Sequence, residues 1–126
     1  MAECCCGSNT PTRLIYACSG AANTGYLADS AARKLMGDGT GKMTCLAAVG
    51  AELSGFVESA KAADSNIVID GCPVSCGKKI FERLNLPFIH YKTTDFGVEK
   101  GKSQITEEII YGVAGKIAGA ITHGEC

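Results

Sequence analysis

The sequence predicts an α/β fold: a three-layer sandwich in which helices cover both faces of a four-stranded, mainly parallel, Rossmann-like sheet. Short apolar runs alternate along the chain with longer segments in which apolar residues recur every three or four positions, and this order favours strands alternating with helices. The apolar runs are continuous, which is typical of parallel strands buried on both faces. Crossover connections in such a sheet are expected to be right-handed.

The first half of the chain contains two strand–helix units. Residues 13–18 are a short apolar run and are expected to form the first strand. The apolar face of the helix that follows consists of Leu27, Ala31 and Leu35. Glycines in residues 37–41 end this helix, and residues 42–49 are expected to form the second strand. The apolar face of the second helix consists of Leu53, Phe56, Val57 and Ala60.

Two further units make up the second half of the chain. Residues 66–70 contain three β-branched residues in a row and predict the third strand. Pro is favourable in the first turn of a helix, so the third helix is expected to begin at Pro73. One face of this helix carries Cys76, Ile80 and Leu84. Residues 88–91 predict the fourth strand, and a polar loop over residues 93–103 leads to a helix whose apolar face consists of Ile109, Val113, Ile117 and Ile121.

The composition indicates one folded domain. Of the 126 residues, 46% are hydrophobic and 20% are charged, which excludes a mainly disordered chain. Residues 1–12 are expected to form a flexible, cysteine-rich tail, and residues 13–126 a single α/β domain. The formal net charge is −1, so no nucleic acid is expected as a partner. No apolar run is long enough for a membrane span and the first residues lack the features of a signal peptide, so a cytoplasmic protein without membrane contact is expected.

Eight cysteines are unusual in such a chain, because cysteines in cytosolic proteins more often bind metal or take part in redox chemistry than form disulfides. Cys18, Cys45 and Cys72 are separated by two intervals of 27 residues, about one strand–helix unit each. They fall at or near the ends of the first three strands, and the carboxyl ends of parallel strands meet at one edge of the sheet. Cys76 follows Cys72 by four residues, and two residues at that spacing on a helix can face one point.

Four thiols brought together in this way suit Zn²⁺, which prefers four thiolate ligands in a tetrahedron. The amino end of the third helix would favour the thiolate forms of Cys72 and Cys76. The sequence therefore predicts a metal-binding domain with a zinc site that has a structural or metal-handling role. The predicted metal ligands are Cys18, Cys45, Cys72 and Cys76.

The motif Asp70-Gly71-Cys72, with the cysteine segments upstream of it, resembles the DGC-domain family, which is named for Asp-Gly-Cys. The upstream segments are residues 18–20 and 42–46. The resemblance extends over about residues 13–112 and implies a small cytoplasmic prokaryotic protein. It also implies that the four matching cysteines are zinc ligands, whereas no reaction is attached to the family.

Two other functions would use the same cysteines. A thiol redox enzyme would use Cys72 as a nucleophile of lowered pKa and Cys76 as its resolving partner. An iron–sulfur cluster also takes four cysteine thiolates, and the sequence does not separate it from zinc. Whether the protein is an enzyme stays open, because no general base has a clear partner and no catalytic residue is assigned.

The residues around these cysteines have simpler interpretations. Residues 19–25 are expected to shape the site and cap the next helix; a small-anion site is the alternative, although the loop contains no basic residue. Asp70 is expected to make a turn hydrogen bond, with orientation of a thiol as the alternative. His90 is interpreted as structural. The other four cysteines lie outside the predicted ligand set. Capture of a soft metal or sensitivity to oxidation is the alternative role for the tail cysteines Cys4, Cys5 and Cys6, and Cys126 has no nearby partner in the sequence.

Overall fold

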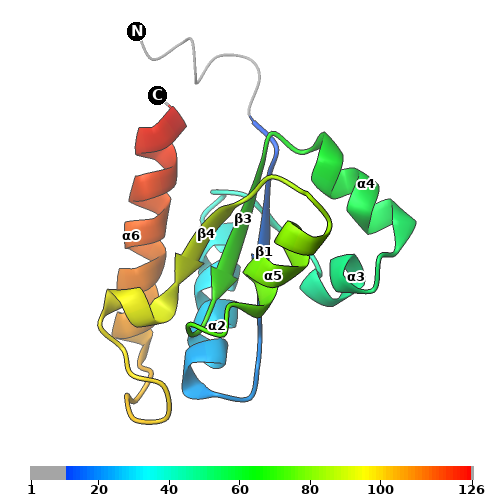
Figure 1. Cartoon of the computed structure of the whole chain (residues 1–126). Helices are drawn as coiled ribbons and strands as arrows, with labels where there is room; N and C mark the ends of the chain where they lie inside the picture. The colour runs from blue at the N-terminus through cyan, green and yellow to red at the C-terminus, as the bar shows by residue number, and fades with distance from the viewer. Residues whose placement is uncertain (1–10, 126) are drawn as a thin grey trace, which may run out of the picture.

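The computed structural model describes residues 11–125, with side chains from residue 11 to residue 122. In this part of the chain, four strands form one all-parallel sheet in the order β2-β1-β3-β4. Figure 1 labels β1, β3 and β4 of this sheet. The bounds of the strands are Arg13–Ala17 for β1, Lys42–Met43 for β2, Ser65–Asp70 for β3 and Ile89–Lys92 for β4. The predicted α/β class and four-stranded parallel sheet are confirmed. Apart from its last two residues, the predicted tail lies outside the described residues, as does Cys126.

The two central strands, β1 and β3, pair along their whole common length, from Arg13 opposite Ser65 to Ala17 opposite Ile69. Successive side chains of a strand point to opposite faces of the sheet, so each central strand contributes to two separate cores. One core receives Ile15, Ala17, Ile67 and Ile69, and the other receives Tyr16 and Val68. Burial on both faces is why these strands are continuously apolar in sequence.

Helices cover each face of the sheet, as predicted (Figure 1). The first core is closed by α2 (Asn23–Gly37) and α6 (Glu107–Glu125). The predicted apolar faces of these two helices are confirmed, because Leu27 and Leu35 of α2, and Ile117 of α6, are almost fully buried. The second core is closed by the shorter helices α3 (Leu46–Gly50), α4 (Ser54–Ala62) and α5 (Cys76–Arg83).

The second strand–helix unit differs from the prediction. Residues 42–49 were expected to be one strand, but β2 ends at Met43 and the apolar residues after Cys45 form the short helix α3. A short apolar run does not distinguish a buried strand from a buried helix, and its two alanines favour the helix. The expected apolar face of the next helix is also largely exposed, since α4 buries only Ala60 and leaves Phe56 in contact with solvent.

The third helix also begins later than predicted. α5 starts at Cys76 rather than at Pro73, and residues 71–74 form turns. Ser75 has a left-handed backbone with φ of 55°, which a continuous right-handed helix from Pro73 would not allow. Cys72 and Cys76 are therefore not neighbours on one helical turn. They are joined by a bend in which the amide of Ser75 donates to the carbonyl of Cys72 at 3.0 Å.

The remaining elements agree with the sequence. β3 and β4 lie within a residue of their predicted positions, and the polar loop after β4 contains one turn of 3₁₀ helix, η1 (Thr93–Phe96). Among residues 11–125, no helix combines the length and the apolar character that crossing a bilayer would require.

Candidate functional site

The four predicted ligand residues all lie at the carboxyl edge of the sheet. Cys18 directly follows β1, and Cys72 lies two residues after the end of β3. Cys45 immediately precedes α3, and Cys76 is the first residue of α5. All four are free thiols, with Cys18 and Cys72 half-buried and Cys45 and Cys76 exposed. The parallel arrangement of the strands thus brings residues from three segments of the chain to one edge.

A cleft of about 830 Å³, called here the open cleft, contains three of these cysteines in its wall: Cys18, Cys45 and Cys76. Met43, Phe56 and Ile80 make part of the wall apolar. Its charged residues are Asp29 and Arg33, which form an ion pair at 2.8 Å. The open cleft is therefore a thiol-lined hollow with a partly apolar wall and no unpaired charge among the residues that line it.

A second hollow of about 210 Å³, called here the small cavity, is lined by Cys18, Cys72 and Cys76. Its other walls come from the start of α2 and from two loops: Gly20, Ala21, Ala22, Thr24, Gly25, Gly71, Val74 and Lys100. Cys18 and Cys76 thus line both hollows. Cys45 lines only the open cleft, and Cys72 only the small cavity.

The thiols do not form a ready-made coordination sphere. Within residues 11–122, no three His, Cys, Asp or Glu side chains are positioned to hold one metal ion as they stand. The donor chemistry of the four thiols fits a thiophilic ion such as Zn²⁺. The geometry fits only if some of these side chains move toward the ion, and the exposure of Cys45 and Cys76 leaves them free to do so.

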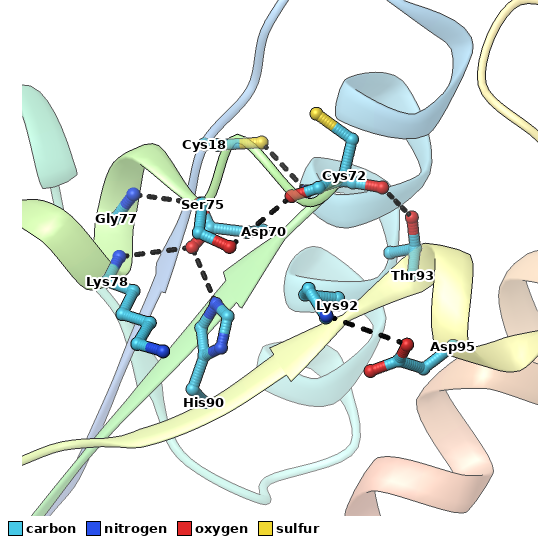
Figure 2. Close-up of polar contacts among 11 residues, drawn as sticks. Cys18, Asp70, Cys72, Ser75, Gly77, Lys78, His90, Lys92, Thr93 and Asp95 are labelled. Atoms are coloured by element: carbon cyan, nitrogen blue, oxygen red, sulfur yellow. Dashed lines mark hydrogen bonds and ion pairs between the residues drawn. The ribbon is translucent and has the colours of Figure 1, made fainter.

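The thiol of Cys18 has the most constrained surroundings. Its Sγ accepts a hydrogen bond from the amide of Gly71 at 3.2 Å (Figure 2). Its own amide donates to the carbonyl of Ile69 at 3.2 Å. Burial raises the pKa of this thiol, and the carboxylate of Asp70 and the thiol of Cys76 act in the same direction. The hydrogen bonds from Gly71 and Gly20 oppose the rise without cancelling it.

Cys72 lies in a turn that is fixed from two sides. The hydroxyl of Thr93 donates to the carbonyl of Gly71 at 2.8 Å, as Figure 2 shows. A Cβ on Gly71 would lie 2.6 Å from the carbonyl carbon and oxygen of Thr24, so the turn packs directly on the backbone of α2. Only glycine permits this approach, which is why the residue before Cys72 has no side chain.

Asp70 holds the start of α5. Its carboxylate is 1% exposed and accepts hydrogen bonds from the amides of Gly77 at 2.8 Å and Lys78 at 3.1 Å. Nε2 of His90 lies 2.7 Å from the same carboxylate (Figure 2). Asp70 was expected to make a hydrogen bond in its own turn, and its carboxylate is found instead in contact with the first turn of α5 and with β4. His90 was interpreted as structural, and its observed partner is Asp70, a contact that no local pattern in the sequence indicates.

Sequence reasoning also missed Lys100, whose Nζ lies 3.4 Å from Sγ of Cys72. The loop that carries it is held by Asn23, which donates from Nδ2 to the carbonyls of Glu99 at 3.0 Å and Ser103 at 2.8 Å. Oδ1 of Asn23 accepts from the amide of Gly101 at 2.7 Å. Cys72 and Lys100 are too far apart in sequence for any local pattern to predict this contact. Only the fold shows that a lysine ammonium lies beside Cys72.

Comparison with known proteins places this chain in a family. The DGC domain matches residues 14–117. A protein of Pseudomonas aeruginosa (strain PAO1), named anaerobic and virulence modulator AnvM, is 33% identical over 91 residues, which are 71% of this chain and 70% of the relative. No solved structure matches the chain. The match to the domain extends across nearly all of both cores and includes all four cysteines of the site, and on these grounds the chain belongs to the DGC-domain family.

Proposed function

We propose that the protein binds a thiophilic metal ion, Zn²⁺ in the first place, through Cys18, Cys45, Cys72 and Cys76. The observation that supports this best is that four free thiols from three segments of the chain line two hollows that have Cys18 and Cys76 in common. A thiol that served only to fill a core would be buried, whereas Cys45 and Cys76 are exposed. Soft thiolate ligands select ions such as Zn²⁺ or Cu⁺ over Mg²⁺ or Ca²⁺.

The arrangement favours metal handling over a permanent structural site. A structural zinc site is closed and holds its ligands in place before or during folding. Here two of the four thiols, Cys45 and Cys76, lie open to solvent rather than enclosed by the fold. Exposed thiolates can be reached by the thiols of another carrier, so an ion held by them can be exchanged. We expect such exchange in the cytoplasm, where thiols stay reduced.

Two residues beside the thiols, Lys100 and Gly71, would stabilise thiolates that hold a metal ion. Bound thiolates carry negative charge, and the ammonium of Lys100 beside Cys72 offsets part of it. The amide of Gly71 donates to the sulfur of Cys18, and such bonds stabilise a ligating thiolate. The relative in Pseudomonas aeruginosa is named an anaerobic and virulence modulator, and a regulatory role for this chain is consistent with that name.

A thiol redox function is the second candidate. Cys72 and Cys76 line the same small cavity, and the ammonium of Lys100 lies 3.4 Å from the sulfur of Cys72. Thiolate attack and resolution would produce a disulfide between the two residues while an external disulfide is reduced to two thiols. An iron–sulfur cluster would need the same four thiolates as zinc and is separated from it by colour.

Metal identity and stoichiometry in freshly isolated protein test these proposals. We expect close to one equivalent of zinc in a colourless sample, and loss of most of it when any one of the four cysteines is replaced by Ser. Cys126→Ser is the control and should keep its metal. A brown sample with iron and sulfide would favour the cluster, and a metal-free protein with a Cys72–Cys76 disulfide would favour redox chemistry. Equal metal loss in the control and the Cys72→Ser variant would contradict the assigned ligands.

A further inference from the structure

We propose that the small cavity binds a single oxyanion, such as inorganic phosphate, sulfate or the phosphate group of a small ester. This ligand differs in class from the metal of the proposed function, and the proposal does not depend on that function. The cavity holds about 210 Å³, which admits one such group. It is smaller than the roughly 300 to 1,000 Å³ of pockets for drug-sized molecules, so a whole nucleotide would not be enclosed.

The amino end of α2 forms one wall of the small cavity. This helix has 15 residues, and its first amides have no partner within the helix. Ala22, the residue before the helix, supplies no side-chain cap, and the first turn contains no acidic residue. The positive end of the helix dipole therefore faces the hollow without a built-in counter-charge, which is the arrangement that binds anions.

A buried hydroxyl gives an independent sign of a missing ligand. Thr24 lines the small cavity and is 1% exposed. Its Oγ1 has no hydrogen-bond partner in the described part of the chain. Burying a polar atom without a partner is unfavourable, so such atoms are rare in native proteins. An oxyanion at the start of α2 would accept a hydrogen bond from this hydroxyl and remove the cost.

Residues 19–25, which lead into α2, contain no basic side chain, and the cation beside the small cavity comes from a distant segment. Lys100 lines the small cavity, and three hydrogen bonds between its loop and Asn23, the first residue of α2, hold that loop against the start of the helix. The position of this ammonium is thus tied to the helix whose amides it would assist. Among the described residues, no Asp or Glu lines the cavity to repel an anion.

Titration of the metal-free, reduced protein with anions tests the proposal. Amide resonances of residues 20–25 are followed by NMR as phosphate, sulfate or glycerol phosphate replaces chloride at constant ionic strength. We expect saturable shifts with each anion. Binding that is tighter for glycerol phosphate than for phosphate would identify an ester as the natural source. Because no metal is present, failure here leaves the metal proposal untouched, and failure of the metal proposal leaves this one intact.

Variants at two positions assign the binding to this cavity. Lys100→Ala removes a charge-assisted hydrogen bond and should weaken binding about tenfold or more, while Lys102→Ala, in the same loop with the same change in charge, should bind like the wild type. Thr24→Val should weaken binding about three- to tenfold, and Thr24→Ser, which keeps the hydroxyl, should restore it. The proposal is overturned if shifts do not saturate, if Lys102→Ala weakens binding as much as Lys100→Ala, or if Thr24→Val binds normally.

Discussion

Nε2 of His90 lies 2.7 Å from Oδ2 of Asp70, and this contact joins β4 to the end of β3 at the point where the Asp-Gly-Cys motif begins. The same carboxylate accepts from the amides of Gly77 and Lys78, so it also fixes the first turn of α5. One buried side chain therefore connects two strands and a helix. The turn that carries Cys72 starts at this junction, and its geometry depends on it.

Replacing the carboxylate by an amide should loosen this junction. Asp70→Asn removes the charge and converts one acceptor oxygen into a donor, which leaves at least one of its three donors without a partner. We expect the free energy of unfolding to fall by about 2 to 4 kcal/mol, as measured by urea denaturation. Amides in the first turn of α5 should exchange faster with deuterium.

The matched control for that change is Asp95→Asn. Asp95 lies in η1 with a side chain that is 63% exposed and makes one contact, at 3.8 Å, with Lys92. Loss of an exposed ion pair costs at most about 1 kcal/mol. Equal destabilisation by the two substitutions would show that Asp70 does not have the special role assigned to it.

Adding a methyl group at Gly71 should force the motif away from α2. A Cβ there would meet the backbone of Thr24 at 2.6 Å, and backbone atoms cannot rotate aside. We expect Gly71→Ala to destabilise the fold by about 3 kcal/mol. In Gly55→Ala, by contrast, the new Cβ meets nothing within 4 Å in helix α4 and should stabilise by about 0.5 to 1 kcal/mol. Thermal or urea unfolding compares the two, and a neutral Gly71→Ala would refute the close approach.

Asn23 should control the order of the loop that carries Lys100. Asn23→Ala removes all three of its hydrogen bonds to residues 99–103, so the amide of Gly101 should exchange with deuterium much faster. Asn23→Asp keeps an acceptor for that amide and loses both donors, so it should give intermediate protection. Hydrogen exchange read by mass spectrometry measures both. Unchanged protection in Asn23→Ala would mean that the loop is held by other contacts.

The thiol of Cys18 should become reactive toward an alkylating agent only at a higher pH in the folded protein than in the unfolded chain. Its pKa is raised by burial, so in the metal-free protein its alkylation should have a midpoint above that of the same residue in urea-unfolded chain. The proton is held more tightly in the folded state, and this group's contribution to stability is therefore complete below the unfolded pKa and is lost as the pH rises through the folded value. Mass spectrometry of the peptide that contains Cys18, after iodoacetamide pulses at several pH values, measures the midpoint. A midpoint equal to or below the unfolded one would contradict the effect of burial.

Long, strongly patterned segments made most of the fold predictable. The β-branched run of β3 and the four-residue apolar spacing in α2 and α6 each allow one structure, and both are found. The carboxyl-edge position of Cys18, Cys72 and Cys76 follows from the same pattern, since it requires only the strand order. The short run after Met43 allowed two structures, and the tertiary context selected a helix there.

The details of the site were beyond sequence reasoning for physical reasons. The left-handed backbone of Ser75 delays α5, and nothing in the residue itself requires that conformation. The contacts from Asp70 to His90 and from Lys100 to Cys72 join segments at least 20 residues apart, so no local pattern encodes them. Four thiols at one edge converge on one point only if each side chain is placed to within less than one turn of helix. Strand order does not determine their placement that finely.

The presence of Cys18 and Cys76 in both hollows has a thermodynamic consequence. An occupant of either hollow that shifts one of these two sulfurs also alters the shape of the other hollow. Linkage makes such influence mutual: the factor by which the first guest changes the affinity for the second equals the factor by which the second changes the affinity for the first. Two ligands bound at this edge of the sheet would then bind cooperatively, and no long-range movement of the fold is needed to couple their sites.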